Sequence, residues 1–161
     1  MNAPLRAAVA TAAFLLSGAA AAQPAQSLSK SYARVVAIVN GTTAYVGGSL
    51  LGCAAANVLT EQQAEERFTS YQARNATLAA RVEAWRKDAE SRLRAQGAER
   101  AAKAKAEEAG LSAIAGSSDQ AEREIGAAPD KRAFCDRRVA AIEAGAADLA
   151  RNPELRDLLA K

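Results

Sequence analysis

Two cysteines, Cys53 and Cys135, have the most distinctive chemistry in this chain of 161 residues. A pair of thiols can serve as nucleophiles, as metal ligands or as a structural disulfide. The sequence contains no histidine, which excludes Ser-His-Asp and Cys-His nucleophilic sites, histidine-ligated zinc and attachment of c-type haem. In an exported chain, two cysteines most simply form one bond. We therefore predict a Cys53–Cys135 disulfide and no catalytic, metal or cofactor site.

Acidic residues offer a second possible chemistry, since Asp119, Glu122 and Glu124 form a group that could hold a cation. Three acids on a polar segment are more often simply exposed. No pair of Asp or Glu residues has a spacing that argues for acid–base catalysis. The chain also lacks a glycine-rich phosphate loop followed by Lys and Ser or Thr. These patterns favour a non-catalytic protein.

Arg67, Arg74 and Arg81 are seven residues apart and would form one basic stripe along a helix. The stripe has two interpretations: a docking surface for an acidic protein or anionic envelope component, or a helix flank whose aliphatic stems cover the core. We favour the second. The formal net charge is only +3, and the acids between the other basic residues interrupt any footprint for nucleic acid. No nucleic-acid partner is expected.

The N-terminus predicts export. Residues 1–22 have the pattern of a secretory signal peptide, with Arg6, a short apolar run and small residues at the cleavage position. Residues 23–29 contain Pro24 and are expected to form a flexible lead-in. Residues 30–161 have the length of a single domain, which we predict to be all-helical and located in the periplasm of a Gram-negative bacterium.

The segment Val35–Thr60 is the longest uncharged run after the leader. It has three interpretations: a buried helix, a membrane span over Val35–Leu59, or a lipidation site, because Leu50-Leu51-Gly52-Cys53 resembles a bacterial lipobox. Its polar and glycine interruptions disfavour a span, and Cys53 lies about thirty residues beyond the leader. We favour the buried helix. Every fourth residue in it is small, which would let a second helix approach closely: Ala44, Gly48, Gly52 and Ala56.

A second helix is predicted after Thr60. Thr60 is a good N-cap, and Gln63 completes a capping box. Apolar residues then recur at a 3-4 spacing that is typical of helix bundles: Phe68, Tyr71, Leu78, Val82 and Trp85. Asn75 occupies a core position, where a polar residue can fix register. Gly97 either ends this helix or bends it, and the pattern leaves both open.

The third segment is poor in large apolar residues. Residues 98–109 contain none and predict a solvated helix. Gly116-Ser117-Ser118 predicts a break. Leu111, Ile114 and Ile125 are its only strong core anchors, so we expect this segment to be the least stable. Beyond it, Pro129 suits a first helical position, and Asn152 can cap a short last helix.

These elements predict a small up-down-up-down helical bundle built around one long central helix. In that arrangement Cys53, near the end of the first helix, and Cys135, near the start of the fourth, lie at the same end. One disulfide would therefore join the first helix to the fourth. The helical patterns are compatible with a monomer or a dimer, so they leave the oligomeric state open.

A short motif adds one functional hypothesis. Leu59-Thr60-Glu61-Gln62-Gln63 resembles the LTxxQ motif of the small helical periplasmic stress chaperones related to Spy. That resemblance implies a dimeric cradle that holds unfolded clients. Our first hypothesis is a soluble periplasmic protein that binds a protein or envelope partner without catalysis. The alternatives are a chaperone like Spy, or a membrane-anchored envelope component.

Overall fold

The computed structural model describes the backbone of residues 19–160 and the side chains of residues 24–160. The predicted signal peptide, residues 1–22, lies largely outside the described residues. Within the described range the chain is helical, with one short 3-10 turn and no strand. The elements are α1 (Ala19–Ala55), α2 (Glu61–Ala95), α3 (Glu99–Ala127), α4 (Lys131–Glu143), η1 (Leu149–Arg151) and α5 (Pro153–Leu159).

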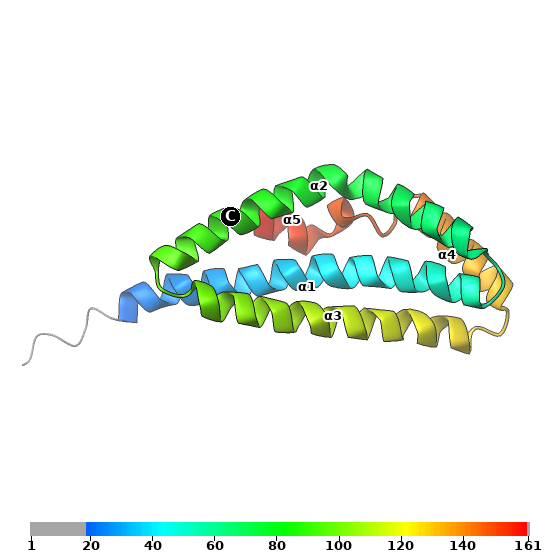
Figure 1. Ribbon diagram of the computed structural model, residues 1–161, viewed down its shortest axis with the longest axis horizontal. Coiled ribbons are helices and arrows are strands. Elements are labelled where there is room, and N and C mark those ends of the chain that lie inside the picture. The colour runs from blue at the N-terminus through cyan, green and yellow to red at the C-terminus, as the bar shows by residue number, and fades with distance from the viewer. Residues whose placement is uncertain (1–18, 161) are drawn as a thin grey trace, which may run out of the picture.

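The elements form an up-down-up-down bundle around α1, as predicted (Figure 1). Helix α3 lies beside α1, whereas α2 arches over the other side of α1. The last leg consists of α4, η1 and α5, which we call the C-terminal leg. It packs between α1 and α2: Leu149 and Leu155 are buried against Val35 of α1 and Leu78 of α2.

Helix α1 begins earlier than the sequence predicts. Residues 23–29, expected to be a flexible lead-in, are helical, and Pro24 lies inside the helix. Proline lacks an N–H and removes one backbone hydrogen bond. That loss falls near the helix start, and tertiary contacts follow at once, because Leu28 packs on the cluster that contains Tyr32 and Leu93. Packing therefore overrides the break signal.

Small residues let α1 and α3 approach closely. A Cβ atom on Gly48 would lie 3.4 Å from the Cβ of Ala121, and one on Gly52 would lie 2.5 Å from Cδ1 of Ile125. On α3, a Cβ atom on Gly110 would lie 3.0 Å from Cγ1 of Val36. The prediction that the small ridge of α1 serves a close helix–helix contact is confirmed.

The third segment differs from prediction in two ways. Helix α3 runs without a break through residues 116–118, because Ser117 packs against Gly41 of α1. Residues 98–109 are also not merely solvated, since Ala102 and Ala106 are buried in the cluster around Tyr32. Alanine side chains are small enough to let the whole helix lie against its neighbour, so large apolar residues are unnecessary here.

The ends of α2 follow local sequence signals. Thr60 accepts a hydrogen bond from the backbone N–H of Gln63, and the Gln63 side chain accepts one from the Thr60 N–H, so the predicted capping box is present. At the other end Gly97 adopts φ +68°. That left-handed conformation suits glycine and ends the helix. The segment from 61 to 109 is therefore two helices rather than one.

The caps of the C-terminal leg are partly as predicted. Asn152 caps α5 by accepting a hydrogen bond from the Leu155 N–H. The expectation that Pro129 is the first residue of α4 is wrong, because the cap is Asp130, whose carboxylate accepts from the Ala133 N–H. The cap lies one residue further along because an aspartate side chain can bond the free N–H groups of the first turn.

The predicted disulfide is present. Cys53 and Cys135 are bonded, with an S–S distance of 2.07 Å and a Cα–Cα distance of 5.7 Å, and both are fully buried beside Ile125. The bond joins α1 to α4 across 82 residues. Because it engages the Cys53 sulfur, the disulfide-bonded protein has no free thiol for lipidation at this position.

Helix α1 has the length and composition of a possible membrane span. Over Pro24–Ala55 its mean hydropathy reaches 1.3 in the most apolar window. The core helix of a soluble protein and a signal sequence can both have this length and hydropathy. In this fold α1 contacts α3 along one side and α2 with the C-terminal leg along the other, and 33% of its most apolar stretch is buried.

Candidate functional site

Two of the three residues in the predicted arginine stripe form contacts within the molecule. Arg67 lies 3.0 Å from the carboxylate of Glu143 in α4. Arg74 donates to the backbone carbonyl of Ile142 at 2.6 Å. Arg81 is exposed and is in no ion pair with another described residue. Two of the three arginines therefore attach α2 to the C-terminal leg, and a docking role for the stripe stays a prediction that depends on Arg81.

Asn75 is the polar residue that connects α2 to the C-terminal leg. It is 5% exposed, and its side-chain oxygen accepts a hydrogen bond of 2.8 Å from the backbone N–H of Leu149. Its amide donates to the Tyr71 carbonyl at 2.9 Å. Asn75 therefore occupies the predicted core position, and its role in fixing register stays a prediction.

The three acids considered for a cation do not converge. Glu124 accepts hydrogen bonds from Tyr45, Gln120 and Arg138, whereas Glu122 lies on another face of α3. Among the described residues, no group of three or more His, Cys, Asp or Glu side chains is placed to hold a metal ion. The arrangement of Glu124 is that of a structural acceptor.

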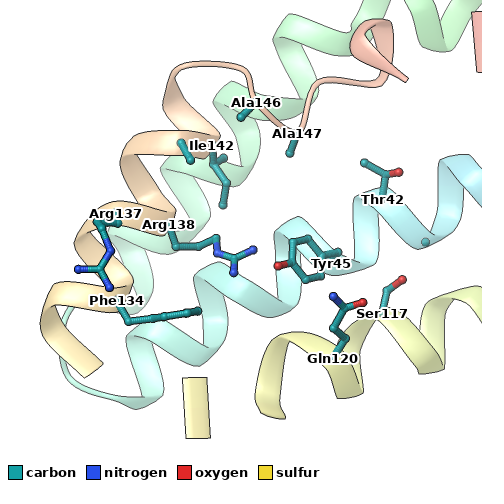
Figure 2. Close-up of a pocket in the computed structure, with 12 residues that line it drawn as sticks. Thr42, Tyr45, Ser117, Gln120, Phe134, Arg137, Arg138, Ile142, Ala146 and Ala147 are labelled. Atoms are coloured by element: carbon teal, nitrogen blue, oxygen red, sulfur yellow. The ribbon is translucent and has the colours of Figure 1, made fainter. Parts of the chain in front are cut away.

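A cavity of about 680 Å³ lies between α1, α3 and α4 (Figure 2). We call it the aromatic cavity. Arg138 extends across it toward Tyr45, with its guanidinium 4.9 Å from the Tyr45 ring centre and 5.1 Å from the Phe134 ring centre. These are cation–π distances. Thr42, Ser117, Gln120 and the apolar side chain of Ile142 complete much of the lining.

Arg138 in the aromatic cavity is paired with a carboxylate. Arg138 donates to Glu124 at 2.6 Å, and the Tyr45 hydroxyl donates to the same carboxylate oxygen at 2.6 Å. Burial lowers the pKa of Arg138, but arginine remains charged at neutral pH. The Arg138 cation is therefore paired within a network that joins three helices. Arg137, which also lines the cavity, is exposed and forms no ion pair with another described residue.

The second concave surface is apolar and open. It lies between α1, α2 and α3, has a volume of about 750 Å³, and has no lining residue from the C-terminal leg. We call it the apolar groove. Its floor is formed by small residues of α1, including Ala44, Gly47 and Gly48. Phe68 of α2 and Ile114 of α3 form opposite walls.

Large aliphatic side chains are exposed at this groove. Leu51 and Ile114 line it, with 63% and 39% of their surfaces exposed, and Leu111 lies one turn before Ile114 with 61% exposed. These are the exposed large hydrophobic residues of the described chain. A single exposed leucine has no special meaning, but two exposed aliphatic residues in the lining of one apolar depression, with a third one turn away, make this surface a candidate interaction site.

This groove corrects one sequence prediction. Leu111 and Ile114 were expected to anchor α3 in the core, and of the three predicted anchors only Ile125 is buried. Helix α3 instead packs through its small residues, such as Gly110 and Ala121. The signal was present in the sequence: glycine and alanine at a repeating spacing supply a packing face, so the larger residues of the same helix fall outside it.

Comparisons with known proteins give no further assignment. The chain matches no family model, and no curated protein or solved structure is similar to it. The LTEQQ segment that resembles the chaperone motif has a local role here, since Thr60 and Gln63 form the cap of α2.

Proposed function

We propose that this protein is an exported, non-catalytic binding protein of the periplasm that holds a protein partner in the apolar groove. The observation that carries the proposal is the exposure of Leu51 and Ile114 in the lining of one depression, with Leu111 exposed one turn before Ile114. Exposed aliphatic side chains contribute little to the stability of the fold, and they lower its solubility. Their concentration at one site is best explained by a partner that covers them.

The buried disulfide and the composition of the N-terminus support export. A disulfide persists in an oxidising compartment such as the periplasm, and Cys53 and Cys135 are fully buried together. The leader-like segment 1–22 would deliver the chain there. The packing of α1 against α2, α3 and both helices of the C-terminal leg supports a soluble domain over a membrane-anchored one.

Recovery of a partner by matched variants tests the groove. Three tagged proteins are used to capture partners from envelope extract. They are the wild type, the groove variant Leu111→Glu with Ile114→Glu, and the control variant Ala101→Glu with Ala104→Glu. The last pair adds the same charge at exposed positions of the same helix. We expect the groove variant to lose a specific partner that the control variant retains. Equal recovery by all three proteins would contradict the assignment of the groove.

Fractionation tests the location and the membrane alternative. Osmotic shock should release the mature protein, cleaved after about residue 22, into the soluble fraction. Retention with membranes after the shock would instead support an anchored envelope component, with α1 as the span.

The chaperone alternative rests on the LTxxQ resemblance and on the same exposed apolar surface. It predicts that the purified protein suppresses aggregation of several unrelated unfolded proteins at near-stoichiometric ratios. A protein dedicated to one partner would show no such general suppression. Light scattering of two chemically different clients with wild type and the Leu111→Glu, Ile114→Glu variant separates the two hypotheses.

A further inference from the structure

Acidic residues surround the apolar groove. The two exposed stretches beside it are residues 61–66 at the start of α2 and residues 108–122 in α3. Together they contain six acidic residues and no lysine or arginine: Glu61, Glu65, Glu66, Glu108, Asp119 and Glu122. The chain as a whole has more basic than acidic residues, so these two stretches differ from its average, and each is followed directly by an arginine, Arg67 and Arg123.

The acids closest to the groove are available for a partner. Glu65 of α2 and Glu122 of α3 line the groove from its two walls, and both residues are exposed. The ion pairs within the described part of the chain involve neither of them. The groove therefore presents an aliphatic strip between two negatively charged edges.

We infer that the partner segment is an amphipathic helix with an aliphatic ridge flanked by lysine or arginine. This inference rests on the proposed function and names the partner class for the same groove. An aliphatic ridge would cover Leu51 and Ile114, and basic residues on either side would meet Glu65 and Glu122. A second copy of this chain fits less well, since pairing two identical grooves would bring acidic edges together.

The shape of the groove favours a helix as its occupant. Ala44 and Ala55 of α1 line the groove with small side chains, whereas Gly48 and Gly52 already pack against α3. The lining residues of α1 extend from Ala44 to Ala55. At 1.5 Å per residue this is about 17 Å, or about three helical turns. A partner segment of about twelve residues, with apolar residues at a 3-4 spacing, would fill it.

Three synthetic peptides test the inference. Each has the same twelve-residue helical pattern with leucine at the ridge positions, and the flanking positions carry lysine, glutamine or glutamate. Fluorescence anisotropy measures their binding to the mature, disulfide-bonded protein. We expect the lysine peptide to bind at least tenfold more tightly than the glutamate peptide. Its affinity should fall as salt rises, because exposed charge pairs are screened.

Two protein variants assign the charge effect to the groove. The double substitution Glu65→Gln with Glu122→Gln should weaken binding of the lysine peptide by about three- to tenfold, since each exposed ion pair contributes a few tenths to 1 kcal/mol. Asp136→Asn with Asp157→Asn removes the same charge from exposed positions of the C-terminal leg and should leave its affinity unchanged.

The outcomes separate this inference from the proposed function. Equal binding of the three peptides, or binding of none, would overturn the basic-helix inference. The groove assignment would still stand if the Leu111→Glu, Ile114→Glu variant lost its envelope partner. Unchanged partner recovery by that variant would overturn the proposed function itself. Circular dichroism and melting of each variant confirm that the fold is retained.

Discussion

A glycine-to-leucine substitution should have opposite effects on stability at two positions of α3, because only one of them lies in the close contact with α1. Gly110 is buried, and a Cβ atom there would lie 2.7 Å from Nδ2 of Asn40 and 3.0 Å from Cγ1 of Val36. Gly116 is exposed six residues later, and nothing lies within 4 Å of a Cβ atom there. Substituting leucine for glycine at each position therefore separates the effect of packing, which acts at Gly110, from the effect of helix propensity, which acts at both.

The magnitudes follow from these distances. At Gly116, replacing glycine inside a helix should stabilise the fold by about 0.5–1 kcal/mol, through helix propensity alone. At Gly110 the same gain is offset by overpacking. The Asn40 amide can rotate, but the β-branched Val36 is stiff, so the helices must separate locally at a cost of about 1–3 kcal/mol. The Gly110→Leu protein should be less stable than the Gly116→Leu protein by about 1–3 kcal/mol.

Urea denaturation of the disulfide-bonded protein, followed by far-ultraviolet circular dichroism, measures both changes. We expect the midpoint to rise for Gly116→Leu and to fall for Gly110→Leu, with similar slopes. Equal midpoints for the two variants would refute the reasoning, because they would show that α3 does not approach α1 closely at Gly110.

Three further predictions concern the bonds that hold the elements together. Cys53→Ser with Cys135→Ser should cost about 2–5 kcal/mol of stability, and native unreduced protein should show no alkylatable thiol by mass spectrometry. Asn75→Leu should cost about 1–3 kcal/mol in urea denaturation, because it leaves a buried backbone N–H without an acceptor; an unchanged midpoint would contradict that role. The hydrogen bonds from Arg94 and then Lys103 lower the pKa of Glu99 from 4.5 to about 2. Because the folded pKa is the lower one, this stabilisation is present above pH 4.5 and is lost as the pH falls toward 2. A Glu99→Gln protein should therefore show a weaker decrease in Tm over that range.

Local signals in the sequence predicted much of the fold. The side chains of Thr60 and Asn152 accept hydrogen bonds from backbone N–H groups in the first turns of their own helices, so neighbouring residues alone determine these caps. The Cys53–Cys135 bond follows from the number of helices between the two cysteines and their alternating directions. These features depend on nearest neighbours or on overall topology, which a sequence expresses directly.

Features that depend on contact between distant helices were harder to predict. The break expected at 116–118 is absent because α3 packs against α1 there. The start of α1 extends through Pro24 because Leu28 packs against apolar residues of α2 and α3. The apolar groove was missed for a related reason. Leu111 and Ile114 have the residue types of core anchors, and only the packing of Gly110 and Ala121 against α1 turns them outward.

Hydrogen exchange on the protein bound to its partner tests the central claim most directly. The account predicts that binding slows amide exchange in residues 44–55, 64–68 and 114–122, which contain the lining of the groove, and leaves α4 at its free rate. Helical amides exchange through local opening, and a bound partner lowers the frequency of that opening. Slowing confined to α4 and the aromatic cavity, or to the helix face around Arg81, would contradict the account, because the partner would then bind away from Leu51, Leu111 and Ile114.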